Sequence, residues 1–169
     1  YLNGLLFEVE GKKLNIVGTD GHRLSFASTS LKDSQEKTQI IIPRKTILEL
    51  IKLLNDSKNE VEINLSKNQA TFNFENISLI TKVIDGKFPD YHRVIPVGHE
   101  NNFDINRAEL LSSMQRASIL SNEKYRGIRL VIEDKQLKLI SNNSEHEQAE
   151  EELEIVYNGP SIDIGFNVT

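Results

Sequence analysis

The sequence predicts an α+β fold made of repeated domains, each combining helices with antiparallel sheets. One segment occurs twice: residues 4–17 return as residues 127–140 at a constant shift of 123 positions (127 − 4 and 137 − 14), with Gly, Glu, Lys and Leu in register. Alternating apolar and polar residues, typical of antiparallel strands, dominate the chain, and two segments have helical spacing. A shift this long exceeds solenoid periods and fits tandem copies of a whole domain.

The first copy opens with a predicted hairpin. Residues 3–10 and 14–18 have strand patterns and flank a turn at Gly11-Lys12. A third strand, residues 23–28, follows the tight turn Asp20-Gly21. We therefore expect three short strands before the first helix.

The rest of the first copy is predicted to be a loop, a helix and three more strands. The polar residues 31–39 suit a loop, and Pro43 suits a helix start because its missing N–H costs nothing in the first turn. The helix should cover residues 44–55, with an apolar stripe of Ile47, Leu50, Ile51 and Leu54. The strands should cover residues 61–65, 70–74 and 77–83.

The second copy follows a polar linker, residues 96–102, which contains Pro and Gly. Asn106 is predicted to cap a helix over residues 106–120, with Glu109 placed for a capping box. Its buried side should comprise Leu110, Leu111, Met114 and Ala117. Strands are expected over residues 127–132, 137–141, within 147–156, and 161–166.

These patterns predict two domains, residues 1–97 and residues 98–169. In the second copy a helix precedes the repeated strands, whereas nothing precedes them in the first; the first copy continues past its strands into a helix, whereas the second stops there. We therefore expect the chain to be a fragment. The first domain would lack an N-terminal helix and strand, and the second would lack its C-terminal half.

The composition of the chain excludes several classes of function and site. The net charge is −5, so no global positive field attracts the chain to nucleic acid or to an anionic membrane. The chain contains no Cys, which excludes disulfides and thiolate metal sites. No apolar run reaches membrane-spanning length, and no signal-peptide pattern is present.

Catalytic motifs are absent from the sequence. The four histidines have no zinc-ligand spacing, and no GxSxG, Walker A or GxGxxG motif is present. An enzyme would have to use Asp20, His22 and Asp90, for example as a metal-assisted hydrolase, but Asp20-Gly21 is more simply a turn. We therefore expect no catalytic residues, no metal and no cofactor.

Two charged clusters have both a structural and a functional interpretation. The glutamates within residues 145–154 could be a solvated strand face or a row that meets a basic partner subunit. By strand alternation Glu150, Glu152 and Glu154 share one face, with Glu147 and Glu151 opposite. The basic residues of helix 44–55 could be a solvated face or could line a channel.

Five motifs together carry a resemblance to a known family. They are residues 19–24 (TDGHRL), 42–45 (IPRK), 85–91 (DGKFPDY), 119–127 (ILSNEKYRG) and 165–168 (GFNV). In order and spacing the whole chain resembles the bacterial DNA polymerase III beta subunit, the replicative sliding clamp. The resemblance implies a clamp fold with helices on the inner face of a ring and sheets outside, and a non-enzymatic, cytoplasmic processivity factor for DNA replication.

The resemblance also implies partners. Two full-length subunits would close into a homodimeric ring around double-stranded DNA without reading its sequence. The replicative polymerase catalytic subunit, the clamp-loader complex, and other polymerases and repair proteins would dock through short peptides; no membrane contact is implied. The DNA-facing residues would be Tyr1, Arg44, Lys45, Lys52, Arg107 and Arg116.

The resemblance places a peptide-binding pocket between the two domains. Its apolar members could take a peptide Leu or Phe, while Arg93 and His22 could bond the peptide backbone or acidic groups. The family's C-terminal tail, beyond Thr169, would complete the site. The implied pocket residues are Leu2, Thr19, Gly21, His22, Arg23, Leu24, Pro89, Arg93, Val94, Tyr125 and Asn167.

One half of the family's dimer interface is also implied. The partner surface belongs to a first domain that this chain lacks, so we expect the fragment not to close a ring. Gln148 stands where relatives can carry a carboxylate. The implied interface residues are Ile119, Leu120, Glu145, Glu147, Glu150 and Glu151. Besides the hydrolase, the remaining alternative is a β-rich binding module unrelated to replication.

Overall fold

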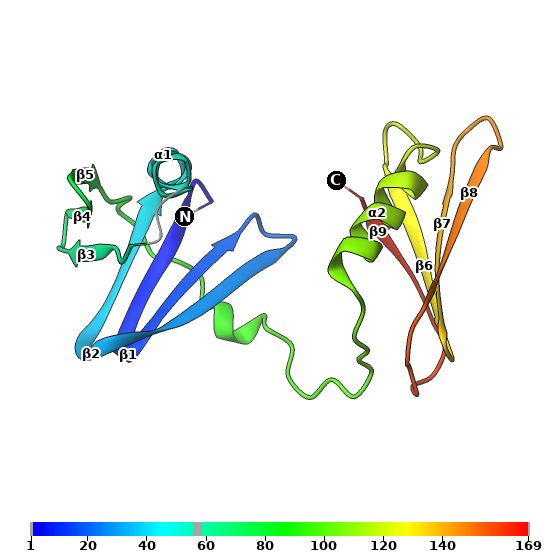
Figure 1. Cartoon of the computed structure of the whole chain (residues 1–169), viewed down its shortest axis with the longest axis horizontal. Coiled ribbons are helices and arrows are strands. Elements are labelled where there is room, and N and C mark those ends of the chain that lie inside the picture. Colours follow the sequence, from blue (N-terminus) through cyan, green and yellow to red (C-terminus); the bar gives the residue numbers. More distant parts are fainter. Residues whose placement is uncertain (1, 56–58, 169) are drawn as a thin grey trace. The chain divides into compact units, whose positions relative to one another are not determined.

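The computed structural model describes residues 2–55 and 59–168, and the chain divides into two compact units, Tyr1–Ile95 and Pro96–Thr169. The first unit contains β1 (Gly4–Thr19), β2 (Leu24–Pro43), α1 (Arg44–Leu54), β3 (Glu62–Leu65), β4 (Gln69–Phe74), β5 (Ile77–Lys82) and the 3-10 turn η1 (Tyr91–Arg93). The second contains α2 (Arg107–Ser118), β6 (Gly127–Glu133), β7 (Gln136–Asn142), β8 (Gln148–Glu154) and β9 (Ile162–Asn167) (Figure 1).

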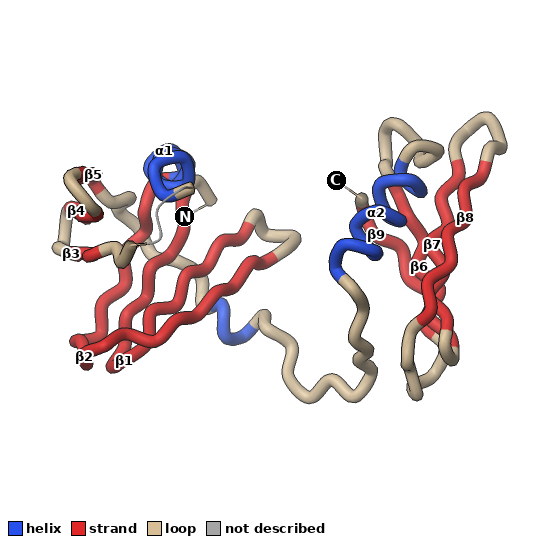
Figure 2. Tube along the Cα trace, in the orientation of Figure 1, coloured by secondary structure: helices blue, strands red, loops and turns tan. Residues whose placement is uncertain are grey.

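The long strands β1 and β2 form a ribbon that folds back on itself. Asn15 Nδ2 lies 3.3 Å from Glu8 Oε2, although seven residues of extended strand would span about 23 Å. The chain therefore reverses between them, at Gly11, whose φ of 59° is one that glycine adopts without strain. The fold-over is visible in both Figure 1 and Figure 2, and it confirms the turn predicted at Gly11-Lys12.

The loop predicted for residues 31–39 is wrong, because this stretch lies within β2. At the fold-over, Gln35 is opposite Gly11 and Ser30 is opposite Lys13. More residues of β2 than of β1 therefore lie in the bend. Its polar composition reflects solvent exposure on the outside of the bend, and it does not prevent strand pairing.

The strand pairing of the first unit recurs in the second. The second sheet has the order β8-β7-β6-β9, all antiparallel. In it, Gly127 pairs with Asn167 and Lys138 with Glu152. In the first unit Gly4 pairs with Pro43 and Asn15 with Ser28, which is the same pattern shifted by 123 residues on one strand and 124 on the other. The structure confirms the predicted duplication.

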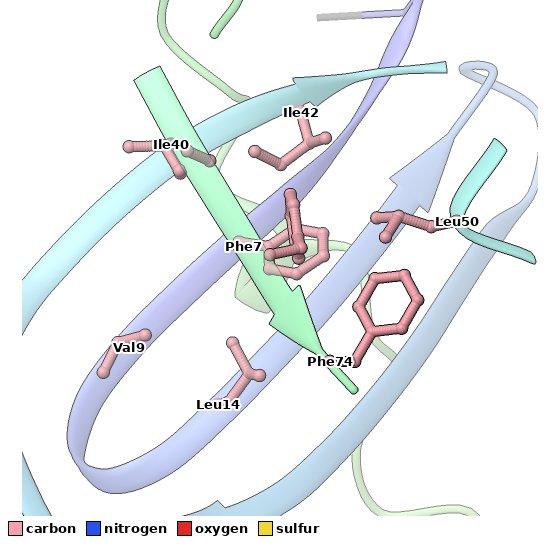
Figure 3. Packing of buried hydrophobic residues seen from close by; sticks show 9 residues of the cluster. Phe7, Val9, Leu14, Ile40, Ile42, Leu50 and Phe74 are labelled. Atoms are coloured by element: carbon pink, nitrogen blue, oxygen red, sulfur yellow. The ribbon is translucent and has the colours of Figure 1, made fainter. Parts of the chain in front are cut away.

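The main core of the first unit lies between the ribbon, α1 and the sheet β3-β4-β5. The rings of Phe7 and Phe72 meet edge to face with centroids 6.0 Å apart, an arrangement that aromatic pairs favour. Figure 3 shows Leu50 of α1 and Phe74 of β4 gathered with Phe7 in this cluster. Burial of these side chains fixes α1 against the sheets.

The apolar stripe predicted for the first helix needs one correction. Leu50 is buried and Ile47 and Leu54 pack against the core, but Ile51 is 60% exposed. Residues of an α-helix are 100° apart, so Ile51 lies on the flank of the side that the other three share. The periodicity identified the helix correctly and overestimated the width of its buried face.

The second unit buries one side of α2 against its four-stranded sheet. Asn106 Oδ1 accepts hydrogen bonds from the amides of Ala108 and Glu109, at 2.9 and 3.2 Å, which confirms the predicted cap. Ala117 is fully buried, as predicted. Leu111, also predicted to be buried, is 45% exposed, and Ser113 is buried instead. At 100° per residue Ser113 lies about 40° from Ala117, whereas Leu111 lies about 160° from Ser113 and about 120° from Ala117, and so it points away from the side that they share.

Replacing Asn106 by Ala should destabilise the second unit by about 0.5–2 kcal/mol, because two amides at the start of α2 lose their acceptor. The measurement is urea unfolding followed by circular dichroism. The control is Asn106→Asp, which keeps a side-chain acceptor and should stay within a few tenths of a kcal/mol of the parent. Equal losses in both variants would contradict the capping role.

Candidate functional site

The turn between β1 and β2 is held by its own side chains. Thr19 Oγ1 donates to the carbonyl of Arg23 at 2.8 Å and accepts from the amide of Gly21 at 3.1 Å. Asp20 Oδ1 accepts from the amides of His22 and Arg23, both at 3.0 Å. These amides hold the pKa of Asp20 at about 2, below its ordinary value of 3.8. The turn therefore presents His22 and Arg23 outward from a fixed backbone.

The segment that follows β5 meets this turn on the other face of the ribbon. Leu6, Val17, Ile41, Phe88 and Tyr91 form a second buried cluster, and Leu24 packs against it. The structure thus brings Leu24 and the 88–95 segment together, as the pocket prediction requires of this unit. Beside the cluster Val94 is 65% exposed, and Pro89 and Arg93 are also exposed.

Two further predicted pocket residues meet in the second unit. Asn167 Nδ2 donates to the carbonyl of Tyr125 at 3.1 Å, and the Tyr125 side chain is 68% exposed. Asn167 ends β9, and the amide of the next residue, Val168, bonds the carbonyl of Arg126 at 2.8 Å. Leu2, in the first unit, is 57% exposed just ahead of β1. In the first unit Leu2 and Val94, and in the second unit Tyr125, are exposed side chains that can bind apolar groups.

A buried carboxylate that sequence reasoning did not single out supports this site. Glu8 is 4% exposed and accepts hydrogen bonds from the Tyr91 hydroxyl, from Gln39 Nε2 and from Asn15 Nδ2. Burial by itself would raise the pKa of Glu8, but the three hydrogen bonds outweigh it and the pKa lies below its ordinary value of 4.5. Burial and the Glu8 carboxylate raise the pKa of Tyr91 to about 12.

The sequence did contain a signal for this residue. Glu8 stands between Phe7 and Val9 in an otherwise apolar segment of β1. Phe7 and Val9 face the main core, and by strand alternation Leu6 and Glu8 face the opposite side, where Leu6 joins the second buried cluster. Both faces of this segment are therefore buried. A charged residue is rarely buried unless it is paired. A lone carboxylate in such a strand was therefore a candidate for a buried network.

The basic residues of α1 lie on its exposed side. At 100° per residue, Lys45 and Lys52 point away from the stripe of Ile47, Leu50 and Leu54. Lys52 Nζ pairs with Glu49 at 3.0 Å, with the Lys52 side chain exposed and the Glu49 side chain about half exposed, and a surface pair of this kind contributes little to stability. Among the described residues Arg44 and Lys45 form no ion pair. Tyr1, also predicted to face DNA, lies outside the described residues.

The two arginines predicted to face DNA on α2 differ from each other. Arg107 is exposed in the first turn. Arg116, by contrast, makes a two-pronged ion pair with Glu151 of β8, with Nε–Oε1 and Nη2–Oε2 distances of 2.8 and 2.6 Å. Hydrogen bonding from Arg116 lowers the pKa of Glu151. Two residues assigned to different surfaces by the resemblance are therefore joined within the second unit.

The acidic strand β8 forms one edge of its sheet. Glu150, Glu152 and Glu154 are exposed and share one face, as predicted, while Glu151 is half-buried on the other. Lys138 of β7 lies 3.7 Å from Glu150 and 3.3 Å from Glu152, which reduces the repulsion between them. Of the other predicted interface residues, Ile119 is 77% exposed, Leu120 is half-buried, and Glu145, Glu147 and Gln148 are exposed.

The two aspartates of the hydrolase alternative are engaged in local interactions. The Asp20 carboxylate is occupied by two amides and by Arg23 Nε at 3.0 Å, and Asp90 pairs with Arg93 at 3.9 Å. Within residues 2–55 and 59–168, no three His, Asp or Glu side chains are grouped to hold a metal ion. In the same part of the chain, neither helix has the length and apolar character needed to span a membrane.

Comparison with protein families gives two adjoining matches. Residues 1–90 match the DNA polymerase III beta subunit, central domain, and residues 92–169 match the DNA polymerase III beta subunit, C-terminal domain. The fold and its duplicated strand pairing thus define a pair of clamp-type domains in tandem. The chain belongs to the DNA polymerase III beta subunit family, as the resemblance of its motifs predicted, and the clamp fold is confirmed.

Individual relatives agree with this assignment. The chain is similar to the Beta sliding clamp of Pseudomonas aeruginosa, 46% identical over 100% of this chain, and to that of Escherichia coli K12, 41% identical over 100%. It spans 46% of the length of each. The crystal structure of the P. aeruginosa DNA polymerase III subunit beta matches with a TM-score of 0.92 and 47% identity, covering 99% of this chain and 47% of that one.

Two more solved structures are informative. A putative DNA polymerase III beta subunit from Eubacterium rectale matches with a TM-score of 0.90 at 31% identity, covering 98% of this chain and 46% of that one. A P. aeruginosa DnaN sliding clamp bound to griselimycin matches with a TM-score of 0.91 at 46% identity, covering 98% and 45%. The fold is therefore retained at much lower identity, and one relative binds a ligand. The comparisons give the hydrolase alternative no support.

The lowered pKa of Glu8 predicts an acid-sensitive first unit. A carboxylate whose pKa is depressed by folding stabilises the folded state above its ordinary value of 4.5, and this contribution is lost as the pH falls through the folded-state pKa. The free energy of unfolding, measured by urea at pH 7 and below pH 4.5, should fall less steeply in Glu8→Gln than in the parent. The exposed Glu10, replaced by Gln, serves as control; equal pH dependence of parent and Glu8→Gln would contradict the prediction.

Proposed function

We propose that this chain is part of a sliding clamp, a non-enzymatic processivity factor that encircles duplex DNA and tethers the replicative polymerase. The carrying observation is the family match over both adjoining domains, at residues 1–90 and 92–169. The P. aeruginosa and E. coli relatives are named Beta sliding clamp. In this proposal the full-length protein forms the ring as a homodimer, and the clamp loader and repair proteins share its docking site.

The charge of the chain is consistent with this mechanism. A closed ring retains DNA by topology, so strong pairing with phosphates is unnecessary and would oppose sliding. The net charge is −5, and Arg116 is already paired with Glu151. Few phosphate contacts release few counterions, and at a slope of about −0.9 per contact the logarithm of the affinity falls only gently with the logarithm of salt. Lys45 and Lys52 remain on the exposed side of α1 for loose contact.

The peptide site proposed for the first unit is formed by the turn between β1 and β2 and by the segment that follows β5. Leu24 and Val94 offer apolar surface, and the outward His22, Arg23 and Arg93 offer hydrogen-bond donors. The turn is fixed by Asp20 and Thr19, so little conformational entropy is lost when a peptide binds. A P. aeruginosa relative has been solved bound to griselimycin, which is consistent with a ligand-binding role for this family.

Retention on circular DNA tests the ring. The full-length protein, loaded on a nicked circular plasmid by its clamp loader, should remain bound during gel filtration in high salt and should be released when the plasmid is cut once. Only a closed ring has this dependence, because a linear end lets it slide off. Equal retention on circular and linear DNA would identify an ordinary binding module and overturn the proposal.

A charge in the apolar part of the pocket tests the docking site. Leu24→Asp in the full-length protein should reduce binding of a fluorescent peptide from the polymerase C-terminal tail by at least about 30-fold, because an unpaired carboxylate in an apolar contact costs more than 2 kcal/mol. Ring closure on DNA should be unchanged. The control is Ile80→Asp, at a 63% exposed apolar position on β5. Unchanged peptide binding by Leu24→Asp would refute the pocket.

A further inference from the structure

We propose that Glu8 is a positioning residue of the peptide pocket, which holds the turn η1 so that Val94 and Arg93 are presented correctly to a bound peptide. This inference rests on the proposed function, because it assigns a role within that pocket. It adds a residue that lies behind the pocket surface and has no access to the peptide, since Glu8 is 4% exposed.

Glu8 joins three segments that are distant in the sequence. The Tyr91 hydroxyl on η1 and Asn15 Nδ2 on β1 both donate to Oε2, and Gln39 Nε2 on β2 donates to Oε1. Asn15 Nδ2 is also 3.3 Å from the Tyr91 hydroxyl. Both carboxylate oxygens are thus occupied, and η1 is tied to both strands of the ribbon at one point.

Tyr91 passes this constraint directly to the pocket residues. Its carbonyl accepts hydrogen bonds from the amides of Val94 and Ile95, each at 3.2 Å, and the amide of Arg93 bonds the carbonyl of Asp90 at 3.3 Å. Tyr91 is 3% exposed and its ring lies 5.9 Å from that of Phe26. Any displacement of Tyr91 therefore moves the backbone that carries Val94.

Stability alone does not require a carboxylate at this place. Among the described residues Glu8 is the one charged side chain that is buried, and an apolar side chain would fill the same space without a desolvation cost. Hydrogen bonds to an ion are directional and stronger than neutral ones, so they fix the orientation of Tyr91 where apolar packing would tolerate several. A carboxylate at position 8 thus fixes the orientation of Tyr91 more strictly than an apolar side chain would.

His92 is the only other titratable side chain within ion-pair distance of Glu8 in the described part of the chain. Its Nε2 lies 3.8 Å from Glu8 Oε2, and its side chain is 66% exposed on the solvent side of the network. The centroid of its ring lies 4.1 Å from that of Tyr91, with the two planes tilted by 32°. Tyr91 thus has ring contacts with both His92 and Phe26.

The test removes one hydroxyl in each unit of the full-length protein. Tyr91→Phe keeps the ring and loses the bond to Glu8. Tyr157→Phe is the matched control, because Tyr157 is 2% exposed and its hydroxyl bonds the carbonyl of Pro160 at 2.8 Å in the second unit. The readouts are the melting temperature, the Kd for the fluorescent polymerase-tail peptide, and the methyl NMR signals of Val94.

We expect both variants to melt earlier, but only Tyr91→Phe to weaken peptide binding, by about 3- to 10-fold, with shifted Val94 methyl signals. Glu8→Leu should weaken binding at least as much, while Glu8→Gln, which keeps an acceptor for Tyr91, should be milder. A lower melting temperature with unchanged Kd in Tyr91→Phe and Glu8→Leu would overturn the positioning role. If Leu24→Asp also left the Kd unchanged, the failure would lie with the pocket itself.

Discussion

The first unit depends on one buried carboxylate at the place where its ribbon folds over. Glu8 and Asn15 meet because the chain reverses at Gly11, and the same carboxylate then receives Gln39 and Tyr91. Removing any one donor would leave a buried charge less well satisfied, which is costly. The ribbon, the turn η1 and the peptide site proposed for the first unit are therefore coupled through a single group.

Duplication reproduces the pairing without reproducing this interaction. At the shift of 123 residues, Glu8 corresponds to Val131 and Asn15 to Lys138, and Lys138 lies within 4 Å of Glu150 and Glu152 on an exposed face. The strand arrangement is thus supported by apolar burial in both units, and the polar groups have diverged. In the second unit the polar groups form ion pairs with the edge strand β8, and in the first unit they attach η1 to the ribbon.

Sequence patterns predicted the helices, most strands, the Asn106 cap and the duplication because these depend on local spacing and capping chemistry. They failed for residues 31–39, where tertiary pairing overrides a polar composition, and for Ile51 and Leu111, whose exposure depends on how each helix meets its sheet. The periodicity of a sequence does not show which distant residues meet, so it could not predict the contacts of Tyr91 with Glu8 and of Arg116 with Glu151. Motif resemblance named the proposed pocket residues but did not name Glu8, which is buried behind those of the first unit.

The distribution of charge on the two helices suits a protein that retains DNA by ring closure and attracts its phosphates only weakly. On α2, Arg116 is paired by Glu151 within the unit, so its charge is largely compensated locally. On α1, Lys45 lies on the side opposite the core and forms no ion pair with any residue that the structure describes, and the pair of Lys52 with Glu49 is weak because it lies at the surface. Charges of this kind can approach phosphates at little cost and release them as easily. A protein that must hold DNA and still move along it needs closure for the first task and weak, exchangeable contacts for the second.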